Sequence, residues 1–276
     1  MGSPAAKKLK TSASGVPTYL DLDLGQLTVE PTLGGRSDPK YAYVNYKGQR
    51  LEFQLATGVG DPVRAPFGID DGSTFGSKPS IKLELSDPAQ LALVRGLEEA
   101  VISTAIAHKA EWFPGVKPPP TDDEVRDGFA SRVAVDDGGK YPPLLRVNCT
   151  LADDGKPPLR VGVTRRLPNG NITPVRPGAP TDVAKGATVV PKLRTQGGAW
   201  VKKVKKLAPN TFGLVLEVGE LLVVHGADAA GLGAFHLGDG VAVEDDGGGA
   251  GGAEDADADR HRTTHAALDQ FKLDGQ

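Results

Sequence analysis

The side chains with the clearest chemistry are cations that gather late in the chain. Residues 155–216, the basic segment, hold twelve Lys or Arg residues and a single acid, Asp182, although the whole chain has a formal net charge of −3. At the centre of the segment Trp200 is followed by the cations Lys202, Lys203, Lys205 and Lys206. A strand here would carry positive charge on both faces, and a polyanion relieves the repulsion within such a surface. A solvated lysine-rich edge strand that discourages aggregation is the alternative interpretation.

Aromatic rings lie next to cations at several points of the sequence, a pattern typical of proteins that bind single-stranded nucleic acid. Such proteins contact phosphates with cations and stack bases on rings, and each stacked base contributes roughly 1–3 kcal/mol. The candidate contact residues are Tyr46 with Arg50, Phe67 with Arg64, Trp112, Tyr141 with Lys140 and Arg146, and Trp200 with Lys202, Lys203 and Lys205, together with Arg165 and Arg166.

The rings do not all have the same expected role. Tyr141 and Trp200 are the leading candidates for stacking, because we expect both to be exposed. For Phe67 and Trp112, packing in the core is the favoured alternative. Phe53 and Phe212 are in phase with aliphatic neighbours and are predicted to be core residues.

Side chains suited to catalysis or metal binding are scarce. The chain has one cysteine, Cys149, and five scattered histidines, and those in the core have no acid or cysteine at metal-ligand spacing. The sequence has neither a Gly-rich phosphate loop ending in Lys-Ser/Thr nor a Gly-x-Ser-x-Gly motif. We therefore predict no enzyme activity, no metal and no cofactor. One alternative stays open, an enzyme whose site is assembled across loops such as Gly58–Gly76.

Both ends of the chain are predicted to lie outside the folded domain, which we place at residues 18–225. Residues 1–17 form a basic arm with Lys7-Lys8-Leu9-Lys10, a pattern that resembles a short nuclear import signal. Residues 226–276 lose periodicity and are rich in acids and glycine, which predicts a disordered acidic tail. No apolar run is long enough to span a membrane, and we expect no secretion signal.

Period-two alternation predicts a mainly β fold with one long helix. Strands are expected near residues 41–46, 51–55, 81–85, 145–151, 159–163, 199–207 and 211–224. The helix is expected from Pro88 to about Ala110, and a short second helix from Thr121 to Phe129, since Thr121 and Glu124 have capping-box spacing. Residues 166–186 read as a long loop. The elements together predict a barrel or sandwich of seven to nine strands with an α insertion.

An ordered series of short motifs resembles the single-stranded DNA-binding proteins of nucleocytoplasmic large DNA viruses. The series consists of Phe53-Gln54-Leu55, Ala65-Pro66-Phe67-Gly68-Ile69, Ser80-Ile81-Lys82-Leu83-Glu84-Leu85, a helix leading to Trp112-Phe113, and Tyr141-Pro142-Pro143-Leu144-Leu145-Arg146-Val147. It covers roughly residues 40–224. The resemblance implies an OB-like barrel, elaborated with extra strands and the long helix at about 88–110, that binds single-stranded DNA.

The acidic tail is similar to the tails of replicative single-stranded DNA-binding proteins. Those tails recruit replication enzymes and compete with DNA for the binding groove. This tail departs from the usual pattern, because Lys272 follows Phe271 and the chain ends in Gly-Gln. The departure weakens the expected recruiting role of Phe271 more than the expected masking role of the acids.

We therefore expect sequence-independent binding of single-stranded DNA in viral replication, recombination or repair, in the host nucleus or a cytoplasmic virus factory. The expected partners are single-stranded DNA and, through the tail, replication enzymes, with no membrane involved. The alternative is a structural protein of the virion or of chromatin that binds duplex DNA, RNA or an acidic partner.

Overall fold

The computed structural model describes residues 15–35, 38–73, 78–151, 158–195 and 197–226. All of them belong to one compact unit, residues 1–234. Most of the predicted basic arm and all but the first residue of the predicted acidic tail lie outside the described residues. Pro17 accepts a hydrogen bond from the amide of Gln54 (2.9 Å), so the described fold already includes the last residues of that arm.

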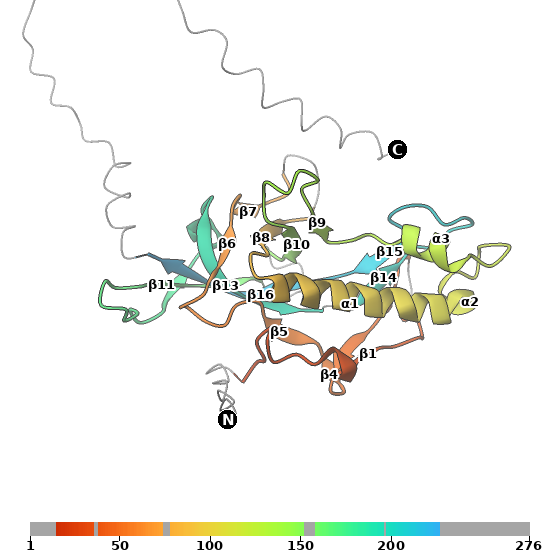
Figure 1. Ribbon diagram of the computed structural model, residues 1–276, viewed down its shortest axis with the longest axis horizontal. Coiled ribbons are helices and arrows are strands. Elements are labelled where there is room, and N and C mark those ends of the chain that lie inside the picture. Colours follow the sequence, from red (N-terminus) through yellow and green to blue (C-terminus); the bar gives the residue numbers. More distant parts are fainter. Residues whose placement is uncertain (1–14, 36–37, 74–77, 152–157, 196, 227–276) are drawn as a thin grey trace, which may run out of the picture. The chain divides into compact units, whose positions relative to one another are not determined.

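The predicted mainly β fold with one long helix is confirmed (Figure 1), but the described residues form sixteen strands rather than the seven to nine expected. The strands are β1 (Leu27–Val29), β2 (Lys40–Ala42), β3 (Val44–Tyr46), β4 (Gln49–Arg50), β5 (Glu52–Gln54), β6 (Val63–Ala65), β7 (Ile69–Asp70), β8 (Ser80–Glu84), β9 (Val133–Ala134), β10 (Leu144–Cys149), β11 (Arg160–Arg165), β12 (Arg176–Gly178), β13 (Ala187–Arg194), β14 (Ala199–Val201), β15 (Phe212–Leu214) and β16 (Glu217–His225). The helices are α1 (Pro88–Ala107), α2 (Lys109–Trp112) and α3 (Asp122–Asp127), with single 3-10 turns η1 (Leu24–Gln26) and η2 (Pro180–Asp182).

Strands β6, β8, β10, β13 and β16 form what we call the central barrel. Numbered one to five along the chain, they follow the ring order 1-2-3-5-4. The third and fifth strands, β10 and β16, are parallel, and the other paired neighbours are antiparallel. The first and second strands, β6 and β8, lie close together, and the Arg64 guanidinium reaches the Glu84 carboxylate (3.4 Å) across the opening between them. This ring order, with its opening between β6 and β8, is that of a partly open, five-stranded Greek-key barrel.

The alternating strands divide cleanly into an inner and an outer face. On β8, Ile81 and Leu83 are buried while Lys82 is exposed. On β10, Leu145 and Val147 are buried while Arg146 is exposed. Successive side chains of a strand point to opposite faces, so the core lies inside the barrel and the cations stand outside it.

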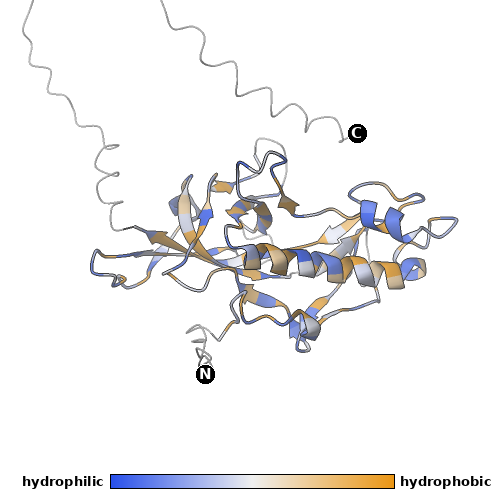
Figure 2. Cartoon of the chain, viewed as in Figure 1, coloured by the Kyte–Doolittle hydropathy of each residue, from blue (hydrophilic) through white to orange (hydrophobic). Residues whose placement is uncertain are grey.

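Helix α1 is inserted between the second and third strands of the barrel and contacts β1, β15 and α3. Its start is fixed by Asp87, whose side chain accepts a hydrogen bond from the amide of Ala89 (2.8 Å) in a capping box with Gln90. A hydrogen bond from the Tyr19 hydroxyl lowers the pKa of the Asp87 carboxyl, which keeps the cap charged. Figure 2 shows hydrophobic and hydrophilic residues alternating along α1, whereas α3 is mostly hydrophilic. The short α3 begins at the predicted Thr121–Glu124 capping box.

Some expected boundaries were wrong. The Gly58–Gly76 loop contains β6 and β7, and the 166–186 loop contains β12 and η2. The strand expected at 199–207 ends at Val201, because the chain turns away through a wide loop in which Asn210 has a left-handed φ of 61° and Pro209 cannot donate to a ladder. The strand expected at 211–224 is divided into β15 and β16.

Candidate nucleic-acid interface

The outer surface of β8 and β10, which we call the β8–β10 face, places two cations side by side. Lys82 and Arg146 are direct partners in the antiparallel register of these strands. Like charges directly opposite one another destabilise a sheet. Among the described residues, no carboxylate lies within ion-pair distance of either cation, and the Arg146 Nε donates to Ser80 Oγ (3.3 Å). The nearest acid of the strand, Glu84, is paired with Arg64.

A third cation, Arg132, adds to the positive charge of this face. The Arg146 amide donates to the Arg132 carbonyl (2.9 Å), and the Arg132 Nε donates to the Leu214 carbonyl (3.0 Å). Desolvation by burial lowers the pKa of Arg132, and the neighbouring charge of Arg146 lowers it further, while Glu98 acts in the opposite direction. Among the described residues, Lys82 and Arg146 therefore have no ion-pair partner, and an anion would relieve the repulsion between them.

Phe67 stands at the edge of this face and is 56% exposed. Packing in the core was the favoured expectation for this ring, and it was wrong. The reason is local: Phe67 lies at the tip of the tight turn between β6 and β7, where Gly68 has a φ of 68° and its amide donates to the Ala65 carbonyl (3.3 Å). The Lys82 Nζ lies 5.3 Å from the centroid of the Phe67 ring. The ring and the cation pair therefore lie together.

Phe67→Ala is expected to weaken binding of an oligo-dT strand by roughly five- to a hundredfold, the loss of one stacked base. Its thermal unfolding should be almost unchanged, because more than half of the ring is already exposed. Fluorescence anisotropy measures the affinity. Phe67→Tyr, which keeps an aromatic face, is the matched control and should bind like the wild type; equal binding by the alanine variant would remove Phe67 from the interface.

Tyr141 is exposed as predicted, at 61%, in the loop that leads into β10. Asp136 fixes this loop, because its carboxylate accepts hydrogen bonds from the amides of Lys140 (2.8 Å) and Tyr141 (3.3 Å). The Lys140 Nζ lies 5.3 Å from the centroid of the Tyr141 ring. This gives a second pair of a ring and a cation beside the strand that carries Arg146.

Trp200 lies on β14, in a smaller sheet formed by β2, β14 and β15, and is half-buried rather than exposed as expected. It is the register partner of Tyr41 on one side and of Gly213 on the other. A Cβ on Gly213 would come within 2.9 Å of the Ala130 carbonyl oxygen and 3.2 Å of the Trp200 Nε1, so glycine allows both groups to approach this strand closely. The Lys202 Nζ lies 5.2 Å from the ring centroid.

Single-stranded DNA is expected to quench the fluorescence of wild-type protein through Trp200, because a stacked base quenches an accessible indole. The other tryptophan, Trp112, is 1% exposed and should not respond. Trp200→Phe should abolish the change in signal, and a quench that persists in this variant would exclude Trp200 as a stacking ring.

Trp112 packs in the core, as the alternative favoured from the sequence predicted, so it is not available as a stacking platform. Its indole Nε1 donates to the Pro31 carbonyl (2.8 Å), and its ring meets Phe212 edge to face at a centroid distance of 6.1 Å. Phe212 and Phe53 are fully buried, as predicted. The aromatic cluster around Phe212 holds the end of the helical insertion against the core.

Arg165 and Arg166 are not brought near Arg146. They lie at the end of β11, where Arg165 is the register partner of His225 and Arg166 donates to its carbonyl. β10 pairs with β16 at residues 217–218 instead. Along β16, the pairing with β10 at Val218 and the pairing with Arg165 at His225 are seven residues apart, a distance of roughly 23 Å in a strand.

Tyr46 and Arg50 also lie apart from the β8–β10 face, in the sheet of β1, β3 and β4. The Arg50 guanidinium lies over the ring of Tyr43 (3.2 Å to the centroid) rather than that of Tyr46. Tyr46 is half-buried, and its hydroxyl donates to the Asp21 carbonyl (3.4 Å). We therefore regard this pair as peripheral to the interface.

Part of the basic segment is neutralised by acids from other parts of the chain. Arg160 and Lys192 both approach Glu220 (3.5 and 3.7 Å), and Lys192 also approaches Glu52 (3.3 Å). Arg194 pairs with Glu217 (3.2 Å). The outer surface of β13 and β16 therefore carries balanced charge, unlike the β8–β10 face.

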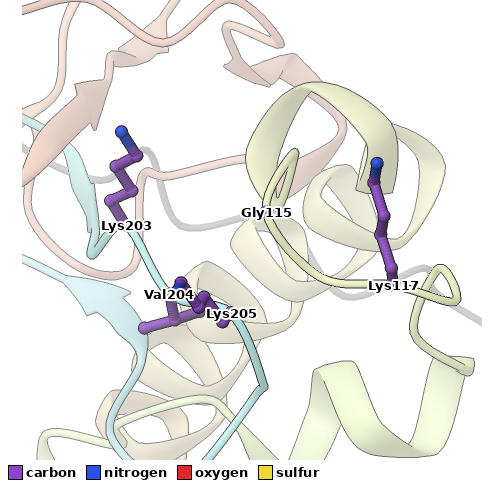
Figure 3. A pocket seen from close by; sticks show the side chains of 5 residues that line it. All are labelled: Gly115, Lys117, Lys203, Val204 and Lys205. Carbon is purple, nitrogen blue, oxygen red and sulfur yellow. The ribbon is translucent and has the colours of Figure 1, made fainter.

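Lys203 and Lys205 lie in the wide loop after β14 and line a hollow together with Lys117 (Figure 3). Sequence reasoning missed Lys117, and it also missed Lys82, Arg132 and Tyr41. The outward phase of Lys82 was readable from the alternation of its strand. Its position opposite Arg146 was not, because helix α1 separates the two strands in the sequence.

In the described part of the chain, no group of three His, Cys, Asp or Glu side chains is arranged to hold a metal ion. No helix there is long and apolar enough to cross a membrane. Cys149 is buried, and desolvation, followed by the charge of Glu217, raises the pKa of its thiol to about 12. A thiol so rarely ionised is not a nucleophile.

Comparison with known proteins finds no protein-family model that matches the chain and no curated protein that matches its sequence.

Proposed function

We propose that this protein binds single-stranded DNA without sequence preference, on the β8–β10 face. One observation carries the proposal: Lys82 and Arg146 stand unpaired as direct neighbours beside the exposed ring of Phe67. They occupy the second and third strands of a five-stranded Greek-key barrel. Strands 2 and 3 and the loops 1–2 and 4–5 are the parts with which OB-folds bind oligonucleotides.

The neighbouring loops supply the rest of the proposed path. The loop between the first and second strands contains Phe67, and the segment between the fourth and fifth contains Trp200 and Lys202. Rings and cations of this kind contact base faces and phosphates, which every nucleotide has. This supports binding that does not depend on sequence.

The proposed biological setting is the replication, recombination or repair of a large DNA virus. The motif series described above supports it, since its members Ala65–Ile69, Ser80–Leu85 and Tyr141–Val147 contain or border the residues of the β8–β10 face. On this proposal the protein covers unpaired DNA without chemically altering it.

A competition assay tests the proposal. Labelled oligo-dT bound to the full chain is displaced by unlabelled single strand, duplex of the same sequence, or RNA. We expect the single strand to compete best and log affinity to fall with log salt by about 0.7 for each phosphate contacted. Preferential displacement by duplex or RNA would favour a structural virion or chromatin protein, and a salt slope near zero would contradict the proposal.

We further propose that the acidic tail competes with DNA for the same face. Residues 226–276 carry eleven acids and three Lys or Arg residues, enough to act as a polyanion within the chain. Truncation after Val243 should therefore tighten oligo-dT binding several-fold at low salt and have little effect at high salt, where screening is strong. Unchanged or weaker binding at low salt would reject self-masking.

A further inference from the structure

A hollow of about 440 Å³ lies between two loops that are far apart in the sequence, and it is lined by Gly115, Lys117, Lys203, Val204 and Lys205. Gly115 and Lys117 come from the loop after α2, and the others come from the loop after β14. Figure 3 shows Lys203 and Lys117 on opposite sides of Gly115, with their ammonium groups pointing the same way.

The two loops that form this hollow are held in place. A Cβ on Gly115 would lie only 2.5 Å from the Val204 carbonyl oxygen, so only glycine allows this close approach. On one side the loop follows the buried Trp112 and Phe113. On the other, the Lys203 amide donates to the Asp38 carboxylate (2.8 Å). The lysines are therefore mounted on anchored backbone.

The charges lining the hollow all have one sign. Three lysines and no carboxylate line it, and among the described residues none of the three lysines has an ion-pair partner. Asp38, whose carboxylate contacts this loop, accepts the backbone amide of Lys203 rather than its side chain. Three ammonium groups around one hollow, with no carboxylate lining it, are complementary to phosphate oxygens, which accept charge-assisted hydrogen bonds.

We propose that this hollow binds phosphate groups, and that linked phosphates bind more tightly than a single one because three cations match more than one negative charge. Within the proposed function, on which this assignment rests, the hollow takes backbone phosphates of the DNA strand that passes Trp200. Lys203 and Lys205 lie three and five residues after Trp200 in the chain, so a strand stacked on that ring lies within reach of them.

The experiment measures inorganic tripolyphosphate binding to the full chain by calorimetry at low salt. Lys117→Gln/Lys203→Gln should lose at least about tenfold in affinity. The control Lys47→Gln/Arg176→Gln removes the same charge from exposed positions on other elements and should bind as the wild type does. Equal weakening of both double variants, or of neither, would overturn the assignment. Thermal unfolding verifies that both variants are folded.

A second arm measures the salt slope for oligo-dT, which should fall in magnitude by about 0.7 for each phosphate contact that the Lys117/Lys203 variant loses. A wild-type slope in that variant would overturn the hollow as a DNA subsite and leave the β8–β10 proposal intact. If the wild-type chain bound tripolyphosphate but no DNA, and the Lys117/Lys203 variant lost tripolyphosphate binding, the phosphate site would be upheld and the proposed function contradicted. Tighter binding of a 5′-phosphorylated strand only when the hollow is intact would identify terminal phosphates as the source, against the backbone assignment.

Discussion

Replacing Lys82 and Arg146 together by glutamine is expected to weaken oligo-dT binding by about a hundredfold. Each charged hydrogen bond to a phosphate contributes roughly 1.5–3 kcal/mol, and 1.4 kcal/mol corresponds to a tenfold change. The magnitude of the salt slope should fall by about 1.4, because two phosphate contacts are lost. Fluorescence anisotropy over a series of salt concentrations measures both quantities.

The same double variant should be as stable as the wild type or slightly more stable. Lys82 and Arg146 repel each other as direct cross-strand partners, and relief of such repulsion stabilises a sheet by some tenths of a kcal/mol. Weaker binding together with equal or higher stability is the pattern expected of binding residues. A large loss of stability would instead assign these cations a structural role.

Arg160→Gln/Lys192→Gln is the matched control for this experiment. It removes the same two charges from strands β11 and β13, where both cations are already paired with Glu220. If only net charge governed binding, both double variants would bind equally weakly. We expect the control to retain most of its affinity, because its cations are engaged within the protein.

Trp112→Ala is expected to lower the free energy of unfolding by about 3–5 kcal/mol, the usual cost of removing a large buried ring. The Trp112 ring is 1% exposed and packs against Phe212, and its loss would also leave the Pro31 carbonyl without the indole donor. Chemical denaturation measures this loss. DNA affinity should be unchanged under conditions in which the variant is fully folded.

Trp200→Ala is the comparison for that experiment, because Trp200 is half-buried and carries the proposed stacking role. We expect a smaller loss of stability and a clear loss of DNA affinity, the reverse of the Trp112 result. If Trp112→Ala weakened DNA binding while stability stayed normal, the assignment of the two rings would have to be exchanged.

Local features of the fold could be predicted from the sequence, because they depend on neighbouring residues. The alternation of Ile81 and Leu83 with Lys82 correctly predicted which side of β8 is buried. The capping box at Thr121 and the proline at the start of α1 correctly predicted where two helices begin. The exposure of Tyr141 and the burial of Phe53 were predicted as well.

Features that depend on distant segments could not be predicted. Lys82 faces Arg146 because β8 and β10 pair, although the long helical insertion separates them in the sequence. The sequence of neither strand determines the register of that pairing. The sequence does not indicate an acidic partner for Arg160 or Lys192, because Glu220, which lies beside both in the fold, is distant from them in the chain. Phe67 is exposed because of the geometry of a single turn, which composition does not reveal.

Ultraviolet cross-linking of oligo-dT to the full chain, mapped by mass spectrometry, locates the DNA on the protein surface. We expect cross-links in the peptide that contains Phe67 and in those that contain Tyr141 and Trp200, and their loss in the Lys82/Arg146 double variant. Cross-links confined to β11 and β12, or unchanged in that variant, would contradict binding on the β8–β10 face.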